Sequence, residues 1–409
     1  MRIVGVVCEY NPFHTGHAWQ LSELRRRFGG DAAVICAMSG NFSQRGDLAV
    51  VRKHIRAEAA VRGGAALVLE LPLPWAISSA EGFARGGTEV LAGTGLVETL
   101  AFGSECADTA RLSRVAEALL SDAFAPALRE ELARGDAFAA ARQRAAERLC
   151  GADAAVLGQP NDILGVEYCK ALRRLASGIE PLALPRAGAA HDGGAAGGFA
   201  SASALRARLR AGEDAGDYLT PAMRALYDGE RAAGRAPVCV ETVERAILAR
   251  LRSLREEELA PFDEGGEGLY RRFFAAGRSA AGVTALLDAV KTKRYARARL
   301  RRMLLSICLG AAPADRPEHV PYLRVLAMDG AGKRLLHEMR KTAALPVLVK
   351  PADVRVLSDE ARRLMELEAR ATDLYALAYP KLAQGAGGSE WRTDPVIVEE
   401  KASERERER

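Results

Sequence analysis

The first half of the chain alternates short apolar runs with segments of helical periodicity. Four runs of consecutive apolar residues predict buried strands, at residues 3–7, 33–38, 66–71 and 99–102. Apolar residues at helical spacing predict helices over residues 18–28 and 51–62, and another helix after Asp108, a suitable N-cap. Strands that alternate with helices are typical of an α/β fold with a parallel sheet.

The pattern changes after about residue 185. Residues 187–200 are rich in Gly and Ala and show little periodicity, which predicts a long loop, and Ser201 or Ser203 can then cap a helix. From about residue 213 to 380 the pattern is mostly helical. We therefore expect an α/β, Rossmann-like domain over residues 1–212, an α-rich domain over residues 213–385 and a disordered tail over residues 386–409.

Composition narrows the class of protein. The chain has 409 residues, of which 49% are hydrophobic and 27% charged, as in multi-domain globular proteins. It has no apolar run of the roughly 20 residues that span a bilayer and no visible secretory signal, so we expect a cytoplasmic protein without a membrane role. Seven scattered cysteines without a Cys-x-x-Cys pair predict free thiols and no metal site.

The candidate chemistry is concentrated in residues 8–17, Cys-Glu-Tyr-Asn-Pro-Phe-His-Thr-Gly-His, which follow the first predicted strand. If a helix begins near Phe13 or His14, then His14 and His17 project from one face of its first turn. Free amide groups at a helix N-terminus attract anions, and Gly16 leaves room for a phosphate or a base beside the backbone. The motif predicts a nucleotide site, whereas the alternative is a surface turn with solvated histidines.

Two other segments suit anion binding. The polar loop at residues 39–46, Ser-Gly-Asn-Phe-Ser-Gln-Arg-Gly, follows the second predicted strand and could hold a carboxylate or leaving phosphates. It precedes a basic cluster of Arg52, Lys53, His54 and Arg56, for which a solvated helix face is the alternative.

Three single residues further along have both a functional and a structural interpretation. Gly103 follows a predicted strand, where it either lets a base or ribose pack on the backbone or belongs to an ordinary turn. Asn161 either reads an adenine edge or caps a helix, and capping is the simpler interpretation. Arg186 either pairs with a phosphate or is a surface charge.

The segment of residues 291–302 contains seven basic residues and no acidic residue. On a helix, Leu300, Leu304 and Ile307 would form an apolar stripe for docking and leave basic side chains exposed. Such a surface suits the phosphate backbone of an RNA, and a solvated cationic face is the alternative. The residues predicted to contact RNA are Lys291, Lys293, Arg294, Arg297 and Arg301.

The chain resembles the bacterial tRNA(Met) cytidine acetate ligase family, whose N-terminal half is similar to the HIGH-motif nucleotidyltransferases. Six motifs carry the resemblance in order over about 200 residues: residues 8–17, 38–46, 102–105 (Phe-Gly-Ser-Glu), 160–165 (Pro-Asn-Asp-Ile-Leu-Gly), Arg186 with Gly188, and 201–206 (Ser-Ala-Ser-Ala-Leu-Arg). The second half matches at residues 292–295 and 322–326.

The resemblance implies an enzyme that uses ATP, expected with Mg²⁺, to convert acetate into acetyl-adenylate. It then transfers the acetyl group to the wobble cytidine of elongator tRNA(Met), and no stable protein partner is implied. His14 and His17 would be the catalytic residues. The ATP site implied by the resemblance consists of Val7, Cys8, Glu9, Tyr10, Asn11, Pro12, Phe13, His14, Thr15, Gly16, His17, Ala18, Trp19, Gln20, Gly103, Asn161 and Arg186.

Two other functions are compatible with the same residues. One is an adenylyltransferase that acts on a small phosphorylated metabolite, because a HIGH-type site serves either chemistry. The other is a non-catalytic RNA-binding protein that keeps a nucleotide pocket as a sensor.

Overall fold

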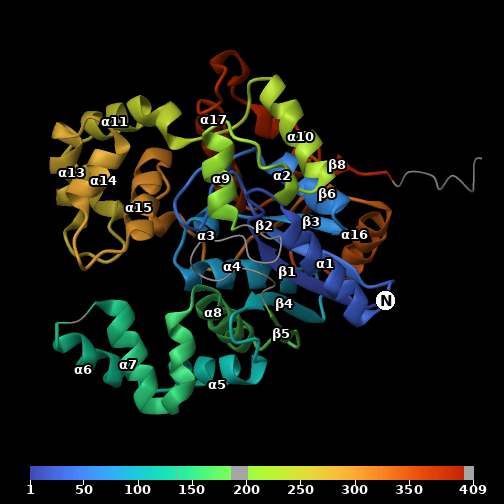
Figure 1. Ribbon diagram of the computed structural model, residues 1–409, viewed down its shortest axis with the longest axis horizontal. Coiled ribbons are helices and arrows are strands. Elements are labelled where there is room, and N and C mark those ends of the chain that lie inside the picture. The colour runs from blue at the N-terminus through green and yellow to red at the C-terminus, as the bar shows by residue number, and fades with distance from the viewer. Residues whose placement is uncertain (136, 186–200, 400–409) are drawn as a thin grey trace, which may run out of the picture.

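A central sheet organises the molecule (Figure 1), and the computed structural model describes residues 1–135, 137–185 and 201–399. Its strand order is β5-β4-β1-β2-β3-β6-β7, and β8 also pairs with β6. The strands are β1 (Ile3–Cys8), β2 (Ala33–Ser39), β3 (Leu67–Leu71), β4 (Thr99–Ser104), β5 (Glu180–Pro185), β6 (Leu323–Met328), β7 (Val347–Leu348) and β8 (Val396–Ile397).

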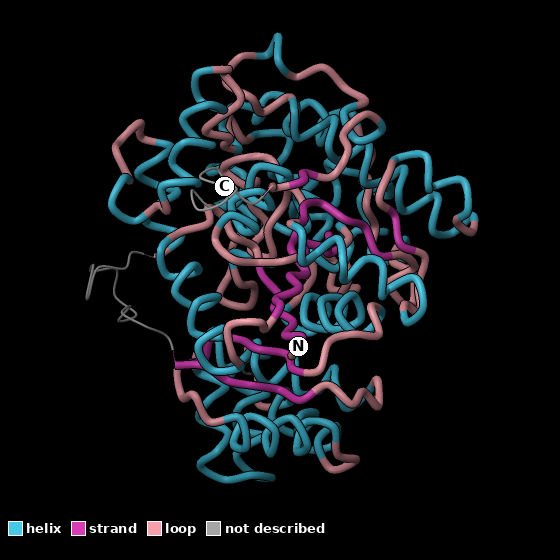
Figure 2. Tube along the Cα trace, turned by 90° about the vertical axis from the view of Figure 1, so that its right-hand side faces the viewer, coloured by secondary structure: helices cyan, strands magenta, loops and turns pink. Residues whose placement is uncertain are grey.

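Helices lie on both sides of the strands (Figure 2). They are α1 (Thr15–Phe28), α2 (Lys53–Arg62), α3 (Leu73–Ala76), α4 (Ala80–Gly93), α5 (Thr109–Leu120), α6 (Phe124–Ala133), α7 (Phe138–Cys150), α8 (Pro160–Arg174), α9 (Ala202–Arg210), α10 (Pro221–Ala232), α11 (Glu244–Ser253), α12 (Glu256–Leu259), α13 (Leu269–Ser279), α14 (Val283–Val290), α15 (Arg297–Leu309), α16 (Gly330–Thr342) and α17 (Asp359–Ala376). Within the described ranges, the helices are all too short or too polar to cross a bilayer.

The predicted strands and helices of the first half are confirmed. Strands β1 to β4 coincide with the four apolar runs, and β5, β4, β1, β2 and β3 pair in parallel. Helix α5 begins after Asp108, which accepts a hydrogen bond from the backbone N–H of Arg111, and α9 begins after Ser201, which accepts from the N–H of Ala204. The α/β fold class therefore follows from hydrophobic periodicity and capping residues.

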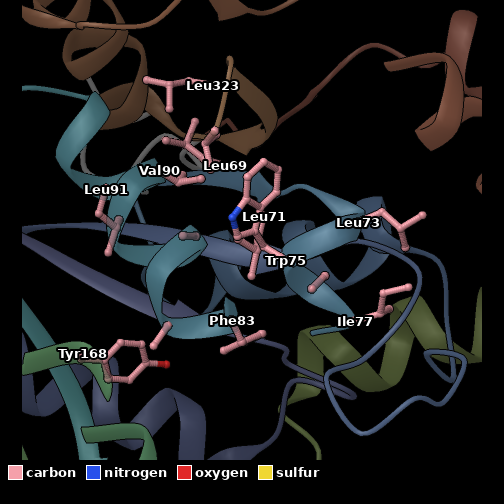
Figure 3. Close-up of a cluster of buried hydrophobic side chains, with 14 of the residues drawn as sticks. Leu69, Leu71, Leu73, Trp75, Ile77, Phe83, Val90, Leu91, Tyr168 and Leu323 are labelled. Carbon is pink, nitrogen blue, oxygen red and sulfur yellow. The ribbon is translucent and has the colours of Figure 1, made fainter. Parts of the chain in front are cut away.

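Helix α4 and β1 pack against each other at two glycines, Gly5 of β1 and Gly87 of α4. A Cβ placed on Gly5 of β1 would lie 2.8 Å from Cδ1 of Leu91, and one placed on Gly87 would lie 2.5 Å from Cγ1 of Val7. Figure 3 shows the adjoining core, in which side chains of β3, α3 and α4 pack together around Trp75. The glycines of α4 weaken its helical periodicity in the sequence, and the close packing explains their presence.

The second half differs from the expected division in two places. Strand β6, from the expected α-rich domain, joins the first-half sheet antiparallel to β3. Residues 386–399, within the expected tail, are ordered: Glu390 is buried and β8 pairs with β6, so the tail expectation is corrected there. Residues 400–409 lie outside the described residues. The helical unit, which we define as α11 to α15, has a core of its own to one side of the sheet (Figure 1).

A buried set of four charges joins the two halves of the chain. Lys53 of α2 and Arg324 of β6 both contact the carboxylates of Glu70 in β3 and Glu390, and all four side chains are buried. Two cations and two anions in mutual contact compensate one another, whereas a single buried charge would be costly. This neutral set explains why the segment around Glu390 is held against the sheet.

Candidate active site

A cavity of about 500 Å³ opens beyond the carboxyl ends of β1, β4 and β5. In parallel α/β sheets this edge is the usual place for a ligand. The lining residues are Val7, Cys8, Glu9, Tyr10, Asn11, His14, Gly16, His17, Trp19, Gln20, Gln44, Arg45, Ala80, Phe83, Phe102, Gly103, Pro160, Asn161, Ile163, Leu164, Tyr168, Leu184, Pro185, Ser201, Ala202 and Arg206. The structure thus brings together most residues of the predicted ATP site.

His14 and His17 lie at the N-terminus of α1 as the spacing predicts. The ring centroids are 3.6 Å apart and the ring planes are inclined by 23°. Nδ1 of His14 accepts a hydrogen bond from the N–H of Gly16 at 3.1 Å, and Nδ1 of His17 accepts from the N–H of His14 at 3.2 Å. A neutral imidazole that accepts at Nδ1 carries its proton on Nε2, so Nε2 is the donor atom of each ring.

Other residues of the motif shape the turn, and among them Tyr10 also lines the cavity. Phe13 is fully buried, and a Cβ on Gly63 would lie 2.4 Å from its ring. The ring of Tyr10 packs edge-on against Phe13, with centroids 4.9 Å apart, and its hydroxyl lies 3.6 Å from Sγ of Cys36. Pro12, Phe13, Thr15 and Ala18 of the predicted ATP site are absent from the described cavity lining.

Cys8 is a buried structural thiol. It lies at the end of β1 with 9% of its surface exposed, and burial raises the pKa of its thiol well above the ordinary value. A raised pKa leaves the thiol protonated and poorly nucleophilic at neutral pH.

The basic cluster after β2 is structural, which corrects the expectation of an exposed helix face. Lys53, His54 and Arg56 are buried. The guanidinium of Arg56 donates to the backbone carbonyls of Val51, Glu9, Ser39 and Gly40, and burial lowers its pKa. Arg56 therefore fixes the ends of β1 and β2, from which the active-site residues project.

The segment after β2, residues 40–48, forms what we call the Gln44 loop. Its backbone N–H at Gln44 donates to Oε1 of Glu9 at 2.6 Å, and the side chain of Gln44 donates to the carbonyl of Ser78 at 3.3 Å. Arg302 of α15 donates to the Gln44 carbonyl at 3.3 Å. The loop thus connects the cavity wall with the helical unit.

Gly103 and Asn161 also line the cavity. Gly103 is the fifth residue of β4, and Asn161 lies in the first turn of α8, whose N-cap is Gln159. The capping interpretation of Asn161 is therefore wrong: its Nδ2 donates to Oε1 of Glu105 at 2.5 Å. Arg186 and the Gly/Ala-rich segment of residues 187–200 lie outside the described residues.

Several lining residues are absent from the list of predicted site residues, among them Arg206, Phe83 and Tyr168. Arg206 of α9 donates to the carbonyl of Asn11 at 2.8 Å, and burial lowers its pKa. Its position in the motif of residues 201–206 was an available signal. Phe83 and Tyr168 come from α4 and α8, and neither stands in a recognisable motif, so only the fold brings them to the cavity.

The basic segment of residues 291–302 is partly neutralised. Its predicted apolar stripe of Leu300, Leu304 and Ile307 is confirmed in the core of the helical unit. The helix begins only at Arg297, which is paired with Asp288 of α14, and Arg294 lies before it and contacts Glu267 at 3.0 Å. Lys291, Lys293 and Arg301 are exposed.

Comparisons with known proteins agree with this geometry. The family model described as HIGH Nucleotidyl Transferase matches residues 1–390. The tRNA(Met) cytidine acetate ligase of Acetivibrio thermocellus is 34% identical over 97% of this chain and 100% of its own length, and that of Caldicellulosiruptor saccharolyticus is 36% identical over 93% and 94%.

Solved structures show the same fold. The crystal structure of Thermotoga maritima TmcAL bound with alpha-thio ATP is similar with a TM-score of 0.90 and 32% sequence identity, and it covers 98% of this chain and 100% of that chain. The apo structure of the same protein has a TM-score of 0.92. The chain belongs to the HIGH nucleotidyltransferase family and, within it, to the tRNA(Met) cytidine acetate ligases.

Proposed function

We propose that the chain is an ATP-dependent ligase that acetylates the wobble cytidine of elongator tRNA(Met). In the first step, an acetate oxygen attacks the α-phosphorus of ATP, the bond to the β-phosphate oxygen breaks, and acetyl-adenylate and pyrophosphate form. In the second step, the cytidine N4 amine takes the acetyl group and AMP leaves. One observation carries the proposal. His14 and His17 stack on each other at the N-terminus of α1, and both line a cavity of about 500 Å³, which is large enough for a nucleotide.

The proposed role of the two histidines is to hold the phosphates. Displacement of pyrophosphate builds negative charge on the α-phosphate and on the leaving group, so catalysis depends on positioning and on fixed donors. Two Nε2 donors and the N-terminus of α1 meet this need without a covalent intermediate. Gly103 and Asn161, which also line the cavity, would then face the ribose and the adenine, and Arg186 would contact a phosphate.

Mg²⁺ fits this site when it is bound to the phosphates of ATP. The described residues contain no group of three or more His, Cys, Asp or Glu side chains placed to hold a metal ion. Mg²⁺ commonly keeps several waters and binds through substrate phosphates. We therefore expect it to enter with ATP, where it neutralises phosphate charge.

The proposed RNA surface is the basic edge of the helical unit. Lys291, Lys293 and Arg301 are exposed there, and Arg301 directly precedes Arg302, which contacts the Gln44 loop. A tRNA bound at this edge would have its anticodon near the cavity. Phosphate contacts of this type depend strongly on salt concentration.

Pyrophosphate exchange tests the proposal. Purified protein with ATP and labelled pyrophosphate should show exchange that requires acetate, and the complete reaction should form N4-acetylcytidine. Exchange that instead requires a phosphorylated metabolite would indicate the adenylyltransferase alternative. Binding of tRNA and ATP without exchange or acetylation would indicate a nucleotide-sensing RNA-binding protein.

A further inference from the structure

Acetyl transfer to a cytidine amine releases one proton, and a group near the cavity must accept it. The N4 nitrogen forms a bond to the acetyl carbon, the bond from that carbon to the phosphate oxygen breaks with its electron pair going to AMP, and the nitrogen loses one proton. The free amine is weakly basic because its lone pair is delocalised into the ring. Its N–H becomes much more acidic as the new bond forms, so a carboxylate of ordinary basicity can accept the proton.

Glu9 is the single carboxylate among the described residues that line the cavity. It follows β1 directly, and Arg56 fixes its backbone carbonyl. Its Oε1 accepts from the N–H of Gln44 at 2.6 Å, and no donor in the described part of the chain is bonded to Oε2. One oxygen is thus anchored and the other is available to a substrate proton.

The two histidines are placed for a different task. Each uses Nδ1 as an acceptor in the first turn of α1, which puts the proton of the neutral ring on Nε2. Rings in that form donate to phosphates and do not accept a proton at the same atom. His14 and His17 therefore serve the nucleotide, which leaves proton acceptance to a different group.

Glu9 also lies on the side of the cavity that adjoins the proposed RNA surface. Gln44 binds its carboxylate through the backbone N–H and binds Arg302 of α15 through the backbone carbonyl. The charged or titratable groups that interact electrostatically with it are Arg56 from α2, Arg206 from α9 and Tyr168 from α8. The two arginines place positive charge near the Glu9 carboxylate.

We propose that Glu9 is the general base that removes the N4 proton during acetyl transfer, an inference that rests on the proposed function. The role differs from nucleotide binding, because it belongs to the second step alone. Adenylation of acetate releases no proton that Glu9 must take, so the two steps respond differently to a change at this position.

Glu9→Gln separates the two steps. The glutamine Oε1 can still accept from Gln44, but the side chain cannot take a proton. We expect single-turnover transfer from enzyme-bound acetyl-adenylate to tRNA to fall about 100-fold, the smaller end of general-base effects, and to fall at least about tenfold more than acetate-dependent pyrophosphate exchange. The decline of the wild-type transfer rate at acid pH should be absent from the variant. Glu9→Asp, which keeps a carboxylate, should recover part of the transfer rate.

Each other outcome overturns the inference. Equal loss of exchange and transfer in Glu9→Gln, or a raised Mg²⁺ requirement for exchange, would assign Glu9 to the nucleotide or to folding. Unchanged transfer with an unchanged pH profile would exclude a base role. If the wild-type chain forms acetyl-adenylate and Glu9→Gln behaves identically in both steps, only the base role of Glu9 is refuted. If the wild-type chain shows no acetate-dependent exchange, the proposed function is refuted as well.

Discussion

Arg302 of α15 donates a hydrogen bond to the backbone carbonyl of Gln44, 3.3 Å away, and so connects the helical unit to the wall of the active-site cavity. The guanidinium of Arg302 is largely buried, and burial lowers its pKa. Beside it, Gly46 has φ +75°, and a Cβ placed there would lie 2.5 Å from the backbone nitrogen of Arg302. The loop and the helix can make this contact only with glycine at position 46.

Gly46→Ala should therefore separate the loop from α15. We expect tRNA acetylation to fall at least tenfold, because Gln44 loses its contact with Arg302. Gly151→Ala is the matched control: it also has a positive φ, +59°, but no atom within 4 Å of the added Cβ. The control should lose about 1 kcal/mol of stability from backbone strain and keep its activity. Equal activity of both variants in a single-turnover assay would show that the contact is dispensable.

His17→Asn tests the assignment of the phosphate donors. The asparagine Oδ1 can replace Nδ1 as acceptor for the N–H of His14 and so preserve the cap, but no Nε2 donor remains. Loss of one preorganised donor costs about 100-fold or more in rate, and we expect that loss in acetate-dependent pyrophosphate exchange. Affinity for tRNA should be unchanged. His337→Asn, at an exposed position of α16, is the control, and normal exchange in both variants would contradict the assignment.

Arg297→Ala combined with Arg301→Ala tests the proposed RNA surface. Two lost phosphate contacts should weaken tRNA binding and make the slope of log affinity against log salt concentration shallower by about 1.5. Arg297 is paired with Asp288, so it is expected to contribute less than the exposed Arg301. The control replaces Arg340 and Arg363, exposed residues of α16 and α17, by Ala. An unchanged slope in the test variant, or the same change in both, would place the tRNA elsewhere.

Glu368 of α17 should make stability depend on pH. Burial, followed by the charge of Glu70, raises the pKa of its carboxyl to about 7 from an ordinary value of 4.5. The folded state then binds more protons than the unfolded state between these values, so this contribution to stability is complete below pH 4.5 and is lost as pH rises through about 7.

Glu368→Gln mimics the protonated form and can still accept from the N–H of Leu73. Relative to wild type, the variant should gain stability as pH rises from 5 to 8, by up to about 3 kcal/mol at 1.36 kcal/mol per pKa unit. Thermal melting of both proteins over this range measures the difference. Melting curves that shift in parallel at every pH would show that Glu368 does not titrate in this range.

The sequence was sufficient to predict strands β1 to β4, helices α1, α2 and α5, and the turn that holds His14 and His17. Apolar runs, the Asp108 and Ser201 caps and the spacing of the histidines are local signals, and each is present in the structure. Strand β6 escaped prediction because it pairs with β3 across more than 250 residues of chain, and a short apolar run within a helical region resembles a helix.

The burial of charged residues was not predictable for a related reason. Lys53, Arg56 and Glu390 have the residue types of a solvated surface, and only the tertiary arrangement supplies the opposite charges and carbonyls that compensate them. Likewise, the sequence does not distinguish Glu9 from the other acidic residues. Only the cavity lining shows that Glu9 is the acidic residue among the described residues that reach the site.

Mass analysis of elongator tRNA(Met) after incubation with the protein, ATP and acetate is the decisive test of the proposed ligase activity. We expect that the wobble cytidine gains one acetyl group, that one AMP and one pyrophosphate form per acetyl group transferred, and that omission of either ATP or acetate prevents the change. An unmodified wobble cytidine in the complete reaction, with protein that binds both ATP and tRNA, would contradict the proposed activity.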